Sequence, residues 1–322
     1  SRQPNTNKRS PTTIGDVAIA PSNPDILWIG TGEANIFRSS QAGAGVYKSV
    51  DAGKTWQHAG LTGTYTIPRI LIHPTNPDIV YVAASGHEWT DNAERGVYKT
   101  TDGGRTWTNV LFVDDRTGAI DLVMDPADPD TLYASTWQRI RQKWNDPRNF
   151  AEYAGSGVHK STDGGRTWTP INKGLPEAKF RGRIGLDVCR SAPNIVYAFV
   201  DNYELSREPT EEEKADPYGL PSSGFIKGAT VYRSDDKGAT WTQMSGLTPE
   251  QKTFMERHSN TYGWVFGQIR VDPSDANTVY TMGLGLNVSY DGGRTIKRFQ
   301  TPGSDHHGQP EFEPVLSATP VA

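Results

Sequence analysis

Short runs of apolar and aromatic residues alternate with polar turns rich in Gly, Pro, Asn and Asp along this chain of 322 residues. Runs such as IVYVAA (79–84) have the length and β-branched content of strands, and no long stretch shows the 3.6-residue apolar spacing of an amphipathic helix. The pattern therefore predicts an all-β protein. The longest connections, among them 200–229 and 246–264, are predicted to be loops.

One polar turn occurs five times. Its copies are YKSVDAGKTW (47–56), YKTTDGGRTW (98–107), HKSTDGGRTW (159–168), YRSDDKGATW (232–241) and a weaker VSYDGGRTI (288–296). The Ser or Thr hydroxyl and the Asp carboxylate can accept backbone N–H groups of the turn, so the motif is predicted to clasp a hairpin. Because a catalytic site needs one asymmetric constellation, five similar turns indicate a structural role.

A second motif keeps step with the first. It joins a turn rich in Pro, Asn and Asp to an aromatic strand at 19–33, 72–86, 124–138, 188–202 and 271–285. Each unit thus predicts four short strands, and a four-stranded unit of ~50 residues repeated in this way is typical of a β-propeller. The sequence predicts a flexible segment at 1–11, a propeller of five Asp-turn units at 12–300, and a loop and tail at 301–322.

The turn S/T-x-D-x-G-x-T-W is similar to the Asp box, or bacterial neuraminidase repeat, of sialidases, xyloglucan-degrading propellers and sortilin-type receptors. The stretches IGTGEA, ASGHEWTDNAERGVYKTTDGG, DDRTGAIDLVMDP and SDHH further resemble large exported bacterial propellers described as sortilin-like or glycosyl-hydrolase-like. The resemblance implies a β-propeller whose Asp boxes lie away from the active face, and a secreted or periplasmic location. It also implies further blades before and after these units. The alternative is a five-bladed ring that is complete in itself, and an incomplete ring predicts self-association.

The units differ most in the connections opposite the Asp boxes, where a rigid scaffold usually carries function. The groups there that can act in hydrolysis are Glu33, His87, Asp115, Asp305 and His307. The groups that can bind a substrate are Arg38, Glu88, Trp89, Arg116, Trp137, Arg139, Arg183, Tyr203 and Tyr262. Two carboxylates suffice for glycoside cleavage, and the aromatic rings offer platforms for sugar rings.

A divalent metal ion is a further candidate. Imidazole and carboxylate groups can hold Zn or Ca with an open position that activates water. The candidate ligands are Glu33, His87, His306 and His307.

Composition excludes several classes of partner and cofactor. The formal net charge of −4 gives no drive toward nucleic acid, and no apolar run reaches the length of a membrane span. No phosphate loop or dinucleotide motif is present, so no organic cofactor is predicted. The single cysteine, Cys189, lies in a strand-like stretch and is expected to be buried.

Three functions stay open on this basis. The leading interpretation is a hydrolase-like propeller with a polar, glycan-directed site on the loop-rich face at the channel mouth. The alternatives are a non-catalytic, sortilin-like propeller that binds a glycan or a peptide, and a metal-dependent hydrolase of phosphate or sulfate esters. A sialidase is disfavoured because TIPRI (66–70) reverses the Arg-Ile-Pro order of that family.

Overall fold

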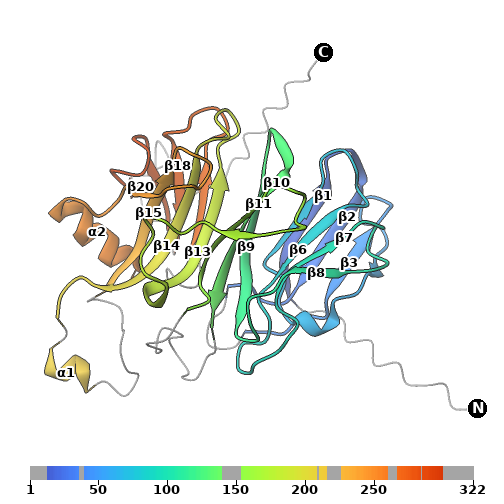
Figure 1. The fold of residues 1–322 in the computed structure, drawn as a ribbon, viewed down its shortest axis with the longest axis horizontal. Helices are drawn as coiled ribbons and strands as arrows, with labels where there is room; N and C mark the ends of the chain where they lie inside the picture. Colours follow the sequence, from blue (N-terminus) through green and yellow to red (C-terminus); the bar gives the residue numbers. More distant parts are fainter. Residues whose placement is uncertain are drawn as a thin grey trace, which may run out of the picture.

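The computed structural model describes residues 13–35, 40–139, 154–208, 210–215, 226–259, 267–283 and 285–299. These residues form five antiparallel sheets of four strands each, in which consecutive strands pair (Figure 1). The prediction of an all-β propeller with four-stranded blades is confirmed. The predicted segments 1–11 and 301–322 lie outside the described residues, and the boundaries of the propeller stay a prediction.

The strands follow the units of the sequence. The first sheet holds β1 (Ile14–Ala20), β2 (Asn23–Thr31), β3 (Val46–Ser49) and β4 (Gln57–His58), and the second holds β5 (Arg69–Ile72), β6 (Val80–Ala84), β7 (Gly96–Thr100) and β8 (Thr108–Leu111). The third holds β9 (Thr117–Asp125), β10 (Asp128–Gln138), β11 (Gly157–Ser161) and β12 (Thr169–Pro170). The fourth holds β13 (Arg181–Val188), β14 (Val196–Leu205), β15 (Ile226–Ser234) and β16 (Thr242–Gln243). The fifth holds β17 (Gln268–Val271), β18 (Val279–Met282), β19 (Leu286–Ser289) and β20 (Lys297–Arg298).

The sheets succeed one another in chain order, with the first and the last at opposite ends of the row in Figure 1. The first strand of each sheet contacts the first strand of the next, from β1 to β5, β9, β13 and β17. A separate apolar core fills each space between sheets: Trp28 and Val46 of the first sheet, for example, pack against Ile70 and Val80 of the second. Since a single sheet cannot bury both of its faces, each sheet depends on its neighbours.

The Asp boxes form the predicted clasps. In the first, Asp51 accepts hydrogen bonds from the Ser49 hydroxyl at 2.8 Å, the Thr55 N–H at 2.8 Å and the Thr55 hydroxyl at 2.6 Å. Ser49 in turn accepts the Gly53 N–H at 2.8 Å, so the whole turn is tied to one Ser–Asp pair. The same Ser or Thr contacts recur at the other four Asp positions, Asp102, Asp163, Asp236 and Asp291.

A lysine links the second, third and fourth Asp boxes to the sheet before each of them. Lys48 of β3 donates to the Gly103 carbonyl in the second box at 3.1 Å, and Lys99 of β7 donates to the Gly164 carbonyl in the third at 2.7 Å. Lys160 of β11 reaches the carbonyl of Lys237 in the fourth box at 3.0 Å. The clasp therefore shapes its own hairpin and also holds the neighbouring sheet.

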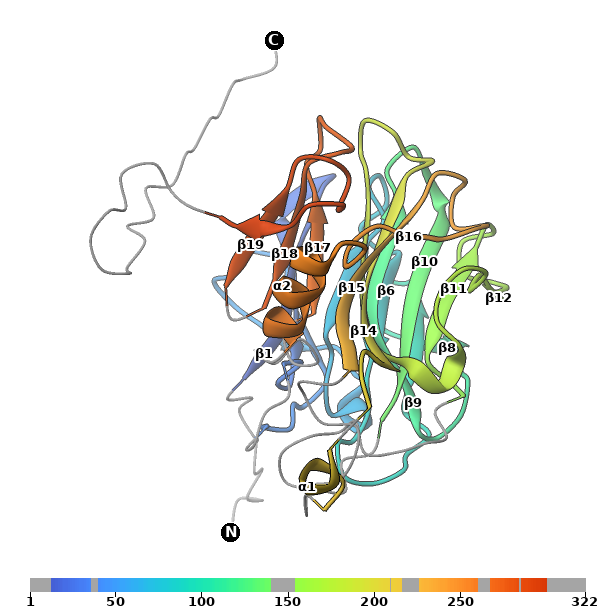
Figure 2. The same cartoon turned by 90° about the vertical axis from the view of Figure 1, so that its left-hand side faces the viewer.

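Two departures from the sequence prediction occur in the long connections. The helix α1 (Glu211–Lys214) lies within 200–229, and α2 (Pro249–Ser259) lies within 246–264, which was predicted to be a loop. The Thr248 hydroxyl accepts the Gln251 N–H at 3.3 Å and so caps α2, and Met255 packs into the core between the fourth and fifth sheets. Figure 2 shows α2 beside these sheets. Cys189 is buried in the same core, as expected.

No helix in the described part of the chain is long and apolar enough to cross a membrane.

The Asp boxes make the fold sensitive to acid. Hydrogen bonds from Thr55 and Ser49 lower the pKa of Asp51 to about 2, and those from Thr240 and Ser234 do the same for Asp236. The pKa of Asp51 in the folded chain lies below its usual value of 3.8. As pH falls through this range, the unfolded chain therefore binds more protons than the folded chain. The stabilisation is complete above about pH 4 and is lost toward pH 2, so we expect Tm to fall steeply between these values.

Calorimetry of an Asp51→Asn, Asp236→Asn double variant tests this expectation. The variant should be less stable at pH 7 and should lose less stability than the parent chain between pH 4 and pH 2. Glu212→Gln, at an exposed site on α1, is the control and should keep the parent profile. Identical acid profiles for the double variant and the parent chain would contradict the assignment.

Candidate functional site

Connections of the second and third units meet opposite the Asp boxes. Asn92, in the connection from β6 to β7, donates its N–H to the Asp115 carbonyl at 3.0 Å, and Arg139 donates its N–H to the Arg116 carbonyl at 3.0 Å. The Arg116 guanidinium donates to the Asp91 carboxylate at 3.2 Å. We refer to residues 85–95, 112–116 and 139 as the loop cluster.

The buried side chain of Arg95 holds the loop cluster together through hydrogen bonds to backbone carbonyls. Its side chain is 0% exposed, and its guanidinium donates to the carbonyls of Ser85 at 2.7 Å, His87 at 2.6 Å and Thr90 at 3.0 Å. Burial, together with the nearby Arg139, lowers the pKa of Arg95 to about 10. Sequence reasoning missed this residue. The sequence signal that could have found it is an Arg directly before a Gly at the start of an apolar strand. In the structure this Gly96 has a positive φ of 104°.

His87 lies between Arg95 and the surface. Its Nδ1 lies 3.0 Å from the Thr90 hydroxyl, its N–H donates to Asn92 Oδ1 at 2.9 Å, and its ring lies 3.7 Å from the ring of Tyr65. Burial lowers the pKa of the imidazole, and the Arg95 charge lowers it further. His87 is therefore a neutral imidazole at neutral pH, the form that can accept a proton or bind a metal.

The outer surface of the loop cluster is aromatic and charged. Trp89 is 46% exposed, and Phe112, Asp115 and Arg116 are also exposed. Glu88 is half-buried next to Trp89. The predicted candidates His87, Glu88, Trp89, Asp115 and Arg116 are thus brought together in one cluster, although they come from two units of the chain.

Four predicted substrate-binding residues are buried instead: Trp137, Arg139, Arg183 and Tyr203. Arg139, the buried member of the loop cluster, lies over the Trp137 ring at 5.1 Å. Arg183 of β13 donates to the Ala34 carbonyl at 3.1 Å and to Asn35 Oδ1 at 3.3 Å, which joins the fourth sheet to the connection after β2. These side chains support the loops, and their contact with a substrate stays a prediction.

Glu33 lies apart from the loop cluster, at the end of β2. It is half-buried, and its carboxylate accepts the Gln41 N–H at 3.3 Å. The remaining candidates, Arg38, Tyr262, Asp305, His306 and His307, lie outside the described residues. Within the described residues, no three His, Cys, Asp or Glu side chains are grouped to hold a metal ion. With His306 and His307 outside that set, the metal site stays a prediction.

An ion pair lies where the first strands of the sheets converge. Arg69 of β5 donates to the Asp121 carboxylate of β9 at 2.8 Å and lies 3.9 Å from the Asp16 carboxylate of β1. Burial favours the protonated form of Asp121, but the charges of Arg69 and Arg270 outweigh it and hold its pKa below the usual value. A hollow of only about 20 Å³ lies here, lined by residues of all five units. A larger hollow of about 640 Å³ lies on the Asp-box side, and its lining includes Pro21, Pro74 and Pro126.

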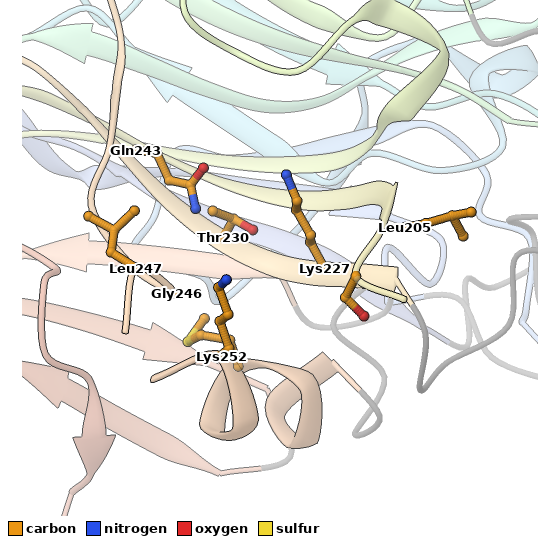
Figure 3. A pocket seen from close by; sticks show the side chains of 9 residues that line it. Leu205, Lys227, Thr230, Gln243, Gly246, Leu247 and Lys252 are labelled. Carbon is orange, nitrogen blue, oxygen red and sulfur yellow. The ribbon is translucent and has the colours of Figure 1, made fainter. Parts of the chain in front are cut away.

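A further hollow of about 310 Å³ lies between the fourth sheet and α2. Lys252 of α2 points toward Thr230 and Gln243 across it (Figure 3). Lys227, on the same wall, is paired with the Glu204 carboxylate at 2.7 Å. The sequence did not predict this hollow, because it depends on a helix that was expected to be a loop.

Comparison with known proteins places the chain among Asp-box propellers. The Sortilin-Vps10 family model (sortilin, neurotensin receptor 3) matches residues 44–213. The xyloglucanase Xgh74A of Acetivibrio thermocellus is 24% identical over 69% of this chain and 25% of its own length. A xyloglucanase of Hypocrea jecorina is 22% identical over 89% of this chain and 42% of its own length. The chain thus spans well under half of the curated relatives it matches.

Solved structures support the fold. An ancestral GH74 enzyme superposes with a TM-score of 0.57 at 16% identity, covering 87% of this chain and 30% of that enzyme. The GH74 enzyme of Niastella koreensis superposes with a TM-score of 0.56 at 23% identity, covering 85% of this chain and 36% of that enzyme. The architecture is therefore that of propellers found in glycoside hydrolases.

We expect Arg95→Met to loosen the loop cluster. The substitution leaves the buried carbonyls of Ser85, His87 and Thr90 without their donor, which should lower the free energy of unfolding by about 3 kcal/mol. Amide exchange across residues 86–91 should accelerate, as read by mass spectrometry beside urea denaturation. Arg190→Met, at an exposed arginine, is the control. Unchanged exchange in the Arg95 variant would show that this guanidinium does not hold the loop.

Proposed function

The chain belongs to the Sortilin-Vps10 family, and from that premise we propose that it is a glycan-directed, glycoside-hydrolase-like propeller whose site is the loop cluster. The observation that carries the proposal is the exposed Trp89 beside the Asp91–Arg116 ion pair and Asp115. An aromatic ring offers a flat apolar surface to a sugar ring, and carboxylate and guanidinium groups bind its hydroxyls. Two relatives named as xyloglucanases support a glycan as the ligand.

Asp91 and Asp115 are the proposed pair of carboxylates. They sit on adjoining connections that the Asn92–Asp115 backbone hydrogen bond holds together. The Arg116 guanidinium lies 3.2 Å from the Asp91 carboxylate and orients it, so in this proposal Asp91 attacks the sugar carbon or activates water. Asp115 has no hydrogen-bond partner for its carboxylate among the described residues, and it would protonate the departing glycosidic oxygen.

The other predicted residues have supporting roles in this proposal. Neutral His87 stabilises the loop 85–95 through hydrogen bonds with the side chains of Thr90 and Asn92. A divalent ion held by Glu33 and His87, with ligands outside the described residues, defines the metal-dependent alternative. A polymeric glycan is met outside the cytoplasm, so the proposal includes a secreted or periplasmic location.

Binding should depend on the exposed aromatic ring and the guanidinium. Trp89→Ala and Arg116→Ala are each expected to weaken binding of xyloglucan oligosaccharides by at least ~10-fold, since each removes one stacking or hydrogen-bonding contact. Calorimetric titration gives the dissociation constants. The control is Tyr290→Ala, which removes an exposed aromatic ring from the fifth Asp box, far from the loop cluster in the sequence. Equal losses in all three variants would place glycan binding elsewhere.

Turnover separates the proposed hydrolase from its alternatives. We expect Asp115→Asn to lower hydrolysis of a glycoside panel by ~100-fold or more while binding changes little, because only the proton transfer is lost. Glu250→Gln on α2 should leave the rate unchanged. Binding without turnover would favour the non-catalytic alternative. Turnover of phosphate or sulfate esters that a chelator abolishes would favour the metal-dependent one.

A further inference from the structure

The hollow between the fourth sheet and α2 carries a positive charge that no carboxylate balances. Among the described residues, its lining holds two lysines and no Asp or Glu. Lys227 donates to the Glu204 carboxylate at 2.7 Å, which offsets its charge. The Lys252 ammonium has neither a hydrogen bond nor an ion pair in the part of the chain that the structure describes. This local charge is opposite in sign to the formal net charge of the chain, −4.

The helix α2 that carries Lys252 is held in place by other residues. The Gln251 side chain accepts the Ile296 N–H at 3.0 Å and donates to the Ile296 carbonyl at 3.3 Å, which ties α2 to the fifth Asp box. Met255 is 3% exposed and packs into the core between the fourth and fifth sheets. Lys252 and Met255 are three residues apart, so both lie on the helix face that lines the hollow. The ammonium is therefore positioned by contacts in which it takes no part.

The wall opposite Lys252 offers uncharged hydrogen-bonding groups (Figure 3). Thr230 of β15 is 4% exposed, and its hydroxyl donates to the Gly228 carbonyl at 3.0 Å, so its oxygen can still accept a hydrogen bond. The Gln243 amide of β16 donates one N–H to the Ser245 carbonyl at 2.9 Å, which leaves its second N–H and its oxygen for a ligand. One donor and two acceptors thus face the ammonium across the hollow.

Apolar side chains complete the lining and narrow the class of ligand. Leu205 and Leu247 are 45% and 61% exposed, so the hollow is open to solvent, and Met255 lies deeper. An inorganic anion would leave these apolar groups uncovered. A carboxylate with an alkyl tail would leave Thr230 and Gln243 without partners, which costs free energy. The volume, about 310 Å³, is near the lower end of small-molecule sites, at about 300 Å³. The ligand that fits is small and combines one carboxylate, hydroxyl groups and an apolar face.

We propose that this hollow binds a sugar acid, a single ring that carries one carboxylate and several hydroxyls. The Lys252 ammonium and the second N–H of Gln243 donate to the carboxylate. Thr230 and the Gln243 oxygen accept hydrogen bonds from ring hydroxyls, and the C–H face of the ring packs on Met255 and Leu247. The site is separate from the loop cluster and does not rest on the function proposed for it.

Calorimetric titration of the whole chain with small probes tests the proposal. Methyl glucuronide carries both the carboxylate and the hydroxyls, methyl glucoside lacks the charge, and hexanoate lacks the hydroxyls. We expect methyl glucuronide to bind at least ~10-fold more tightly than either, because each of the others leaves part of the site unpaired. Inorganic phosphate should not compete with methyl glucuronide, since it cannot cover the apolar wall.

Matched variants place the binding in this hollow. Lys252→Met keeps the aliphatic stem and removes the charge, so it should weaken methyl glucuronide binding at least ~10-fold. Lys54→Met, at an exposed lysine of the first Asp box, is the control and should keep the parent affinity. Lys252→Met should also leave binding of the neutral xyloglucan oligosaccharides unchanged, which separates this site from the loop cluster.

Acetylation of lysine amines, mapped by mass spectrometry, gives a second measurement on the unaltered chain. At ~10 times its dissociation constant, methyl glucuronide should slow acetylation of Lys252 about 10-fold, because the ligand then occupies most of the sites. Acetylation of Lys54 should proceed at the same rate with and without the ligand.

Three results would overturn the proposal. Equal affinities for methyl glucuronide and methyl glucoside would mean that the ammonium does not read a carboxylate. Hexanoate or phosphate that binds as tightly as methyl glucuronide would mean that the hydroxyls are not recognised. Parent affinity in Lys252→Met would place the sugar acid elsewhere. Free glucuronate, as a further probe, identifies the source of the ligand. Tighter binding of free glucuronate supports a free sugar acid, and tighter binding of methyl glucuronide supports an acidic sugar within a glycan.

Discussion

Packing of each four-stranded sheet against the next is the interaction on which the rest of this structure depends. The contact has an apolar part, such as Trp28 and Val46 against Ile70 and Val80, and a polar part in which a Lys of the first three sheets reaches the next Asp box. The apolar part provides most of the stabilisation, because these side chains are removed from water. The lysine helps to fix the position of one sheet along the next, since it donates to a carbonyl in the next Asp box.

The Asp box is therefore more than a turn. Its carboxylate holds the hairpin closed from inside, while its outward carbonyl is the acceptor for the neighbouring sheet. This dual use explains why the motif recurs in every unit and why it is absent from the candidate site. A chain that repeats one clasp at each step can vary its opposite connections freely, because those connections are not needed to hold the sheets together.

The loop cluster shows how such variable connections become ordered. The buried guanidinium of Arg95 donates hydrogen bonds to three backbone carbonyls of the loop, which in a helix or strand would be bonded to backbone N–H groups. Removing a charge from water is costly, and here three close acceptors offset that cost. Because buried hydrogen bonds fix the backbone of this loop, Trp89 and Asp115 can be exposed to solvent in a defined arrangement. The Arg69–Asp121 pair has a comparable role, because it links the first strands of the adjacent second and third sheets.

The sequence by itself determined the strands, the turns and their order, because each unit repeats the same local chemistry. It also determined that the connections of the second and third units share a face, since strand order alone places them there. Only the tertiary structure decided that Trp137, Arg139, Arg183 and Tyr203 are buried while Trp89 and Arg116 are exposed. Only the tertiary structure shows that Arg95 donates to three loop carbonyls, and that α2 forms in a segment predicted to be a loop. These outcomes depend on how side chains and backbone carbonyls meet in three dimensions, and the repeated local pattern carries no record of such contacts.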